Sequence, residues 1–143
     1  MQIQIISGSD FPKKTIPLID NAQQSIDIIV FDWRWYPQDP GAQCQLFNQA
    51  IVRASNKKVV VRAIANNDQV IEILKSVGVN AKRLISTKLM HCKLMIIDKK
   101  IVITGSHNYT QSAFQMNFEL SVILDKLENT NEFDQYFENL WTR

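Results

Sequence analysis

The chain has 143 residues, of which 45% are hydrophobic and 21% are charged, and its formal net charge is +2. This length is sufficient for one domain with its own core over residues 1–143, and the composition excludes a disordered or collagen-like chain. The small positive charge is compatible with an anionic partner but is far below that of a protein that coats nucleic acid.

Two cysteines, Cys44 and Cys92, are too few for a disulfide framework or a zinc site and fit a reducing compartment. No apolar run reaches the length of a membrane helix, and the first six residues alternate like a strand rather than a secretion signal. These features predict a cytoplasmic location, or a secreted or periplasmic one if a signal sequence has been removed.

Strand-like and helix-like patterns alternate along the chain. The expected strands span residues 2–6, 25–31, 58–65, 89–98, 100–104 and 119–124. The expected helices span residues 14–22, 42–55, 68–77, 111–115 and 131–141. This order predicts an α/β fold in which helices flank both faces of a mixed sheet. The turn-like run Asp98-Lys99-Lys100 predicts a tight antiparallel hairpin between two of the later strands.

His91 and Lys93 lie two residues apart, directly before an apolar, β-branched run that predicts a strand. Side chains two apart on a strand point to the same face, so the imidazole and the ammonium should emerge together. Met90 and Leu94 should then point to the other face. An imidazole can act as nucleophile or proton carrier near neutral pH, and a lysine stabilises developing negative charge. The pair therefore suits attack on a phosphodiester.

A second polar stretch, from Gly105 to Asn108, follows the strand expected over residues 100–104. Gly105 permits a close backbone approach or a positive φ angle, and Ser106 and Asn108 offer short hydrogen-bonding side chains. A strand end, a glycine turn and a helix start form a corner suited to phosphate oxygens. The predicted hairpin should bring this corner back to His91.

The spacing His-x-Lys-x4-Asp, followed by Gly-Ser-x-Asn and then Asn-x-Glu, resembles the signature of the phospholipase D superfamily, called HKD. The match runs from His91 to Leu120. Residues 22–28, 46–50 and 58–64 also resemble the family's first strand, first long helix and next strand. The resemblance implies the phospholipase D-like α/β fold and a phosphodiesterase activity.

The resemblance also implies a role for each motif residue. His91 would be the nucleophile in one subunit and the general acid and base in the other. Lys93 and Asn108 would bind the non-bridging oxygens and stabilise the transition state. Ser106 would orient this cluster by a hydrogen bond, and Glu119 would be the carboxylate behind the imidazole.

The family's reaction uses two histidines and two lysines, whereas this chain supplies one set. The resemblance therefore implies a homodimer whose active site lies on a two-fold axis, as in the family's short single-motif bacterial endonucleases. It implies no metal ion and no other cofactor. The sequence shows no carboxylate cluster typical of a two-metal nuclease.

Three other motif positions carry different expectations. Asp98 completes the signature, but seven strand residues separate it from His91 by more than about 20 Å, so we expect a structural role for it. His107, inside the Gly-Ser-x-Asn stretch, either approaches the substrate or points outward. Leu120 stands where family members often have Asn, and a leucine side chain cannot make the hydrogen bond of that Asn.

An aromatic and basic cluster spans Phe31 to Tyr36, at the end of the strand expected over residues 25–31, and includes Trp33, Arg34 and Trp35. Such side chains can stack on bases and contact phosphates, but the tryptophans can equally pack in the core or at a dimer interface. Lys88, just before the motif strand, can extend a phosphate track.

Three functions fit these observations. The single-motif architecture, the mild basicity and the aromatic cluster favour a metal-independent endonuclease acting on DNA or RNA. A phospholipid hydrolase or transphosphatidylase is the second function, and it should show an exposed apolar rim or a lipid anchor, neither of which the sequence reveals. A phosphate- or nucleic-acid-binding module without turnover is the third, for which Leu120 leaves room.

Overall fold

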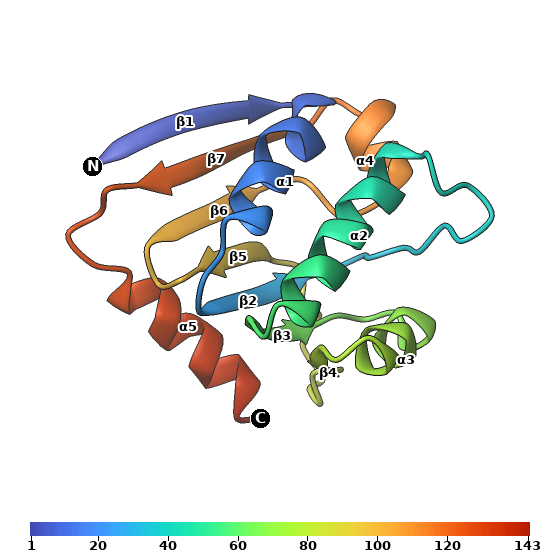
Figure 1. Cartoon of the computed structure of the whole chain (residues 1–143). Helices are drawn as coiled ribbons and strands as arrows, with labels where there is room; N and C mark the ends of the chain where they lie inside the picture. Colours follow the sequence, from blue (N-terminus) through green and yellow to red (C-terminus); the bar gives the residue numbers. More distant parts are fainter.

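Seven strands form one mixed sheet in the computed structural model, which describes residues 1–143 (Figure 1). In sheet order the strands are β1 (Gln2–Ser7), β7 (Leu120–Asp125), β6 (Ile101–Gly105), β5 (Lys93–Ile97), β2 (Ser25–Val30), β3 (Val60–Ile64) and β4 (Asn80–Lys82). The helices are α1 (Asp10–Asp20), α2 (Gln43–Asn56), α3 (Asp68–Ser76), α4 (Gln111–Gln115) and α5 (Asn131–Trp141). This architecture confirms the predicted α/β class with a mixed sheet.

The sheet is parallel on one side and antiparallel on the other. β2, β3 and β4 run parallel, whereas β5, β6, β7 and β1 are each antiparallel to their neighbours. The β5–β6 connection is the predicted tight hairpin, with φ values of 54° at Asp98 and 52° at Lys99. The Lys100 N–H donates to the Ile97 carbonyl oxygen at 2.9 Å, and positive φ at the two central residues of this turn matches the twist of the paired strands.

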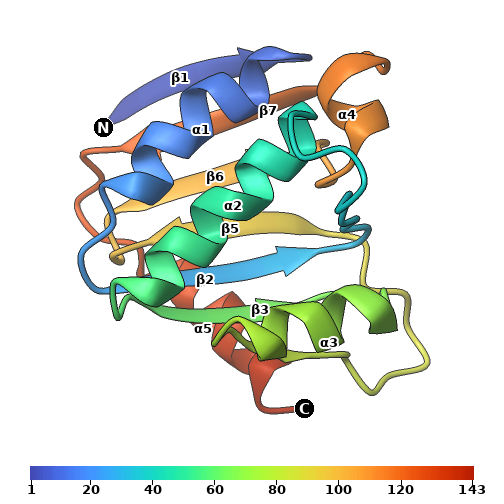
Figure 2. The ribbon, with the colours of Figure 1, turned by 45° about the vertical axis from the view of Figure 1, so that its right-hand side comes forward.

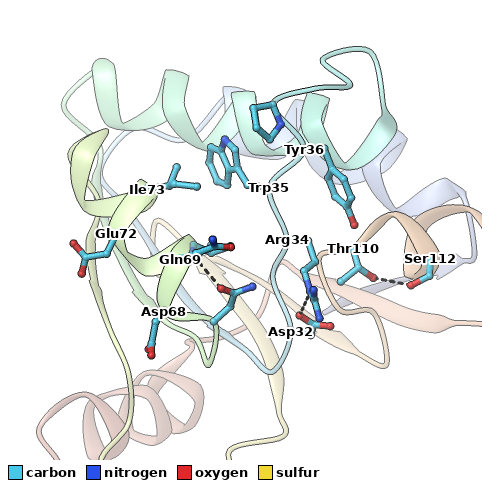
Figure 3. A pocket seen from close by; sticks show the side chains of 13 residues that line it. Asp32, Arg34, Trp35, Tyr36, Asp68, Gln69, Glu72, Ile73, Thr110 and Ser112 are labelled. Atoms are coloured by element: carbon cyan, nitrogen blue, oxygen red, sulfur yellow. Dashed lines mark hydrogen bonds and ion pairs between the residues drawn. The ribbon is translucent and has the colours of Figure 1, made fainter.

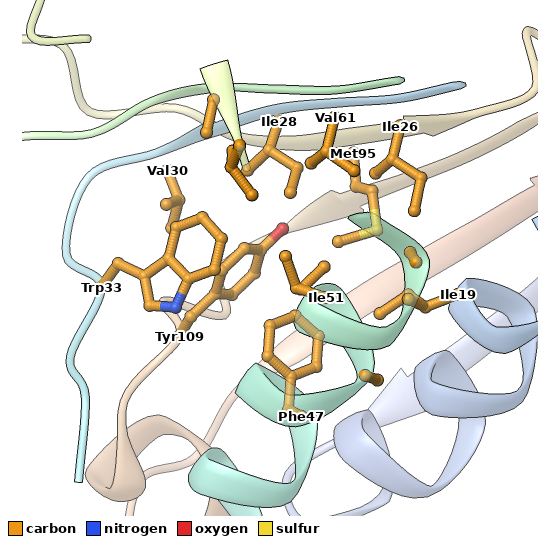
Figure 4. Packing of buried hydrophobic residues seen from close by; sticks show 14 of the residues in the cluster. Ile19, Ile26, Ile28, Val30, Trp33, Phe47, Ile51, Val61, Met95 and Tyr109 are labelled. Carbon is orange, nitrogen blue, oxygen red and sulfur yellow. The ribbon is translucent and has the colours of Figure 1, made fainter. Parts of the chain in front are cut away.

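Helices cover both faces of the sheet, as predicted. α1 and α2 cross one face side by side, and α5 packs on the other (Figures 1 and 2). On the first face, Ile19 of α1 and Phe47 and Ile51 of α2 lie over the strand residues Ile28 and Met95 (Figure 4). The burial of these apolar side chains supplies the main driving force for folding.

The face under α5 has a smaller core of its own. Phe137 of α5 is fully buried in a cluster that includes Ile29 of β2. Arg62 of β3 anchors the helix electrostatically, because its Nε lies 2.8 Å from Asp27 Oδ1 and its Nη2 lies 2.6 Å from Glu138 Oε1. α5 is thereby fixed over the β2–β3 half of the sheet.

The sequence missed β4 and misplaced some boundaries. β4 has three residues, too few for an alternating pattern to show. The strand expected over residues 89–98 begins only at Lys93, because Lys93 pairs with Val30, the last residue of β2. α1 begins at Asp10, earlier than expected, so Pro17 lies inside the helix rather than in its first turn.

Candidate active site

The motif residues other than Asp98 lie at one end of the central strands, and we call this end of the sheet the motif edge. Val30, at the end of β2, pairs with Lys93 at the start of β5. Gly105, at the end of β6, pairs with Ser121 near the start of β7. The chain segments that leave or enter these four strands therefore meet at this edge, although they are far apart in the sequence.

His91 and Lys93 come together at the motif edge, as predicted, although His91 lies just before β5 and only Lys93 belongs to the strand. The Lys93 ammonium lies 3.3 Å from Nδ1 of His91. Met90 and Leu94 are buried in the cluster under α5 instead. The Thr104 hydroxyl of β6 donates to the Lys93 carbonyl oxygen at 2.7 Å and fixes the start of β5. His91 itself is exposed and accessible to a substrate.

The contact with Lys93 determines the tautomer of a neutral His91. A lysine ammonium has three donors and no acceptor, so Nδ1 of His91 accepts. The neutral ring then carries its proton on Nε2, and only after a second proton makes it imidazolium can it give one to an oxygen. For Nε2 to attack phosphorus, the ring proton must be on Nδ1 instead. Nδ1 is then a donor, and it needs an acceptor near it in place of Lys93.

Ser106, Asn117 and Glu119 form a second cluster at the motif edge. The Ser106 hydroxyl donates to Glu119 Oε1 at 2.5 Å, and the Asn117 amide donates to Oε2 at 2.9 Å. The Leu120 N–H, at the position where the family often has Asn, donates to the Ser106 hydroxyl at 3.0 Å. Both Glu119 oxygens thus have donors other than His91. The expected support of the imidazole by Glu119 stays a prediction, and it requires this carboxylate to turn away from Ser106.

Gly105 allows β6 and β7 to approach each other closely. A Cβ at this position would lie 2.4 Å from Cα of Ser121 and 2.6 Å from the Leu120 carbonyl oxygen. No side chain fits in this space, which agrees with the close approach expected from the sequence. The approach sets Ser106 beside the start of β7.

Asn108 connects the motif edge to the end of β2. Its Oδ1 accepts from the backbone N–H of Asp32 at 3.1 Å. Because the amide oxygen faces this donor, the amide NH2 remains available as a donor to another group. The backbone N–H of Tyr109 also donates to the Asp32 carbonyl oxygen at 3.0 Å and holds the two segments together. A fixed donor of this kind suits a phosphate oxygen.

Phe31 is a site residue whose contact with His91 the sequence did not reveal, although it belongs to the aromatic cluster noted there. It follows β2, and its ring centroid lies 4.7 Å from that of the His91 imidazole, with the planes at 46°. The Lys93 ammonium lies 5.7 Å from the centroid of the same ring. The pairing of β2 with β5 creates this contact, and that pairing has no signal in the sequence.

Asp98 lies at the opposite end of β5, in the hairpin turn. Its carboxylate accepts from the backbone N–H groups of Gln23, Gln24 and Ser25. Partial burial raises the pKa of Asp98, but these N–H donors together lower it, and the net result is a pKa below the ordinary 3.8. These contacts match the structural role expected for Asp98.

His107 does not face a substrate, so that expectation is wrong. The ring is 1% exposed and stacks on Phe11 of α1 with centroids 4.5 Å apart. Nε2 donates to the Gly8 carbonyl oxygen at 2.9 Å, and Nδ1 lies 2.7 Å from the Ser121 hydroxyl, which donates to it. Burial lowers the pKa of His107, in spite of the opposing effects of Gly8 and Glu119. Side chains alternate in direction along the Gly105–Asn108 stretch, so the His107 side chain points inward while those of Ser106 and Asn108 point to the motif edge.

Comparison with known proteins identifies the family to which this edge belongs. A family model described as "Cardiolipin synthase, PLD-like domain" matches residues 15–141, which include every motif residue described above. The chain belongs to the phospholipase D-like family. This membership confirms the resemblance seen in the sequence.

Relatives and solved structures agree with this assignment. The mitochondrial cardiolipin hydrolase of Xenopus tropicalis is 32% identical over 130 residues, which cover 87% of this chain but only 58% of that protein. NucT from Helicobacter pylori has a TM-score of 0.75 at 21% identity, with 99% of this chain and 97% of NucT covered. Nuc from Salmonella typhimurium, described as a phospholipase D family member, has a TM-score of 0.80 at 19% identity, with 99% and 95% covered. The two structures share the fold of this chain.

No helix of the structure combines the length and the apolar character needed to cross a bilayer.

Trp33 lies in the core of the phospholipase D-like fold, so of the two alternatives left open by the sequence, core packing is confirmed and contact with substrate is wrong. It is fully buried, and its Nε1 donates to Oδ1 of Asn48 at 2.7 Å. Its ring meets that of Tyr109 edge-on, with centroids 5.1 Å apart. The chain continues past β2 as an extended segment that pairs Trp33 with Tyr109, and this pairing turns the indole inward.

Arg34 and Trp35 line a groove of about 890 Å³ beside the motif edge (Figure 3). The Arg34 Nε lies 2.8 Å from Oδ1 of Asp32, and Asp68 and Glu72 also line the groove. Carboxylates thus outnumber the arginine, and the groove disfavours a phosphate backbone. A contact of Arg34 or Trp35 with an uncharged part of a substrate stays a prediction.

Two grooves on the other side of His91 have the opposite charge. Lys88 lines both of them, together with Arg143 in one and Arg83 in the other. The first groove also reaches His91 itself. Neither lining includes an acidic side chain, but Arg83 is paired with Asp68 at 3.0 Å, so the groove with Lys88, His91 and Arg143 attracts an anion more strongly than the other. Lys88 therefore stands where a phosphate track was expected.

Proposed function

We propose that this phospholipase D-like chain is a metal-independent endonuclease that cleaves DNA or RNA at a site shared by two copies of the chain. The observation that carries the proposal is the His91–Lys93 pair, whose nitrogens lie 3.3 Å apart at an exposed edge of the sheet. The grooves around Lys88 support it, because a polyanionic strand needs cationic surface beside the scissile phosphate.

The reaction has two displacement steps. Nε2 of His91 in one copy attacks phosphorus, so that a P–N bond forms while the P–O bond to the leaving group breaks. His91 of the second copy gives its proton to the departing oxygen. That histidine then takes a proton from water, the resulting hydroxide attacks phosphorus, and the P–N bond breaks to return the nucleophile. Lys93 and the Asn108 amide stabilise the charge on the non-bridging oxygens in both steps.

This scheme requires a second His91, and the sheet offers a surface for a second copy. Ile3 and Ile5 of β1 and Phe118 and Leu120 at the start of β7 form what we call the apolar strip. Ile5 and Leu120 are 60% and 56% exposed, although both are large apolar side chains. The strip lies on the α5 side of the sheet, beyond the strands that α5 covers, and it continues to the motif edge at Glu119. A second copy related by a two-fold axis along the strands would cover the strip and bring both motif edges to the same end.

The interface has its own test. Ile5→Glu should weaken the dimer, so that sedimentation shows monomer at concentrations where the wild-type chain is dimeric. Gln4→Glu adds the same charge on the opposite face of β1 and is the matched control. An Ile5→Glu chain that sediments as the wild-type chain does would exclude the apolar strip as the interface.

Cleavage assays test the activity. Labelled single- and double-stranded DNA and RNA are incubated with the chain in EDTA. We expect internal cleavage that is abolished in His91→Ala and strongly reduced in Lys93→Ala. Lys99→Ala, in the hairpin turn at the far end of β5, is the matched lysine control and should cleave normally. Loss of cleavage in EDTA, or full cleavage by His91→Ala, would contradict the proposal; tight binding without cleavage would indicate a nucleic-acid-binding module.

A phospholipid hydrolase is the second candidate, and one observation favours it. The sequence suggested no apolar rim, but the structure exposes Ile85, Leu89, Met116 and Phe118 in the segments that form the motif edge. These side chains could enter a lipid surface. The relatives named cardiolipin hydrolase point the same way. Release of phosphatidate from cardiolipin vesicles, with only poor cleavage of nucleic acid, would select this candidate. The Ile85→Ser and Leu89→Ser double variant should then lose the release of phosphatidate while its poor cleavage of nucleic acid stays the same.

A further inference from the structure

We propose that Phe31 is a positioning residue that supports the His91 imidazole and the Lys93 ammonium from one aromatic ring while positive charge is present on both. The inference rests on the proposed phosphodiesterase function. It assigns to an uncharged side chain outside the HKD signature a part in setting the rate of the reaction.

The contacts of Phe31 reach both motif side chains at once. Its ring centroid lies 4.7 Å from that of His91, and the Lys93 ammonium lies 5.7 Å from the same ring centroid. The imidazole and the ammonium, which are 3.3 Å apart, therefore share one aromatic support. Phe31 is half-buried, so water is kept from one side of the pair.

The backbone around Phe31 is fixed on both sides. Val30 is the last residue of β2 that pairs with β5. On the other side, the Asp32 N–H donates to Asn108 Oδ1, and the Asp32 carbonyl oxygen accepts from the Tyr109 N–H. The ring is thus presented from a rigid position between the two motif segments, as a positioning residue must be.

The chemistry explains why an aromatic ring is needed here. During the reaction His91 carries a positive charge, either as imidazolium or when bonded to phosphorus, and Lys93 is already positive. Two cations at this distance repel each other. The negative face of an aromatic ring attracts both cations and offsets part of this repulsion. Leucine would fill much of the same space but has no such face.

The kinetic test compares Phe31→Leu and Phe31→Tyr with the wild-type chain. We expect Phe31→Leu to lower kcat by about 3- to 30-fold with KM nearly unchanged, since substrate contacts remain and the support of charge is lost. Phe31→Tyr keeps the ring and should retain most of kcat. Phe133→Leu makes the same change in a half-buried phenylalanine of α5, away from the motif edge, and should leave kcat unchanged. Wild-type kcat in Phe31→Leu, or equal loss in Phe31→Tyr, would overturn the proposal.

A second measurement does not depend on turnover. The chain has two histidines, and the ring protons of the exposed His91 are distinguishable by NMR from those of the buried His107. The Phe31 ring should shift the His91 resonances, and Phe31→Leu should remove that shift while those of His107 stay in place. Unchanged His91 resonances in Phe31→Leu would overturn the contact even if the wild-type chain cleaves nucleic acid. A shift that disappears in a chain without cleavage would uphold the contact and reject the proposed function instead.

Discussion

Replacing Asp98, the third residue of the HKD signature, is expected to destabilise the fold without affecting the chemistry of cleavage. The Asp98 carboxylate accepts from the backbone N–H groups of Gln23 at 2.9 Å, Gln24 at 2.7 Å and Ser25 at 3.0 Å. It thereby ties the β5–β6 hairpin to the start of β2. Asp98→Ala removes all three acceptor contacts at once.

The expected cost follows from these contacts. A hydrogen bond to a charged group contributes about 1.5–3 kcal/mol. The Asp98 site is half-buried, so water can replace part of the loss, and we expect a total of about 2–3 kcal/mol. For a chain of this length, that loss corresponds to a fall in Tm of roughly 7–10 °C. Asp98→Asn keeps one acceptor oxygen and should lose less.

The same contacts predict a dependence on pH. The pKa of Asp98 is below 3.8 in the folded chain, so folding favours the carboxylate. Its contribution is therefore fully present above the unfolded pKa of about 3.9 and is lost as the pH falls through the folded value. The difference between the wild-type chain and Asp98→Ala should be constant from pH 7 to pH 5 and shrink below pH 4.

Urea unfolding at pH 7 and pH 3, with cleavage measured on the folded chain, tests this reasoning. Asp39→Ala, an exposed loop position without a side-chain hydrogen bond, is the matched control and should change neither quantity. Normal cleavage with reduced stability is the expected result for Asp98→Ala. Wild-type stability with abolished cleavage would refute the structural role and point to a catalytic one.

Three further predictions concern stability. Gly105→Ala should cost about 1–3 kcal/mol in urea unfolding, because the new Cβ overlaps Ser121, and a negligible cost would show that β6 and β7 separate freely. Burial lowers the pKa of His107, so its contribution is present above the ordinary value of 6.5 and is lost as the pH falls through the folded value. The wild-type chain should therefore lose more stability from pH 7 to pH 5 than His107→Gln, and equal losses would contradict this. Arg62→Met should cost about 3–5 kcal/mol, since it leaves the buried Asp27 carboxylate without its cation, and an unchanged urea midpoint would disprove that.

The sequence predicted those features that depend on local periodicity and spacing. Strand alternation placed His91 beside Lys93, and the length of the strand separated Asp98 from them. The turn chemistry of the Asp98–Lys100 run predicted the hairpin that returns Gly105 to the motif edge. Each of these inferences needs only residues that are near one another in the chain.

Features that depend on contacts between distant segments were not predictable in the same way. Phe31 contacts His91 only because β2 pairs with β5. Trp33 is buried because its segment pairs with Tyr109, and His107 is buried because α1 brings Phe11 against it. A single sequence does not specify such pairings, so these side chains look alike whether they face solvent, substrate or core.

Subunit mixing tests most directly whether two imidazoles from two identical chains act on one phosphate. Wild-type chain and His91→Ala are mixed in varying ratios at constant total concentration, allowed to exchange, and assayed for cleavage in EDTA. A site that needs His91 from both copies predicts that the rate falls as the square of the wild-type fraction. A rate that falls in direct proportion to this fraction would contradict the shared site.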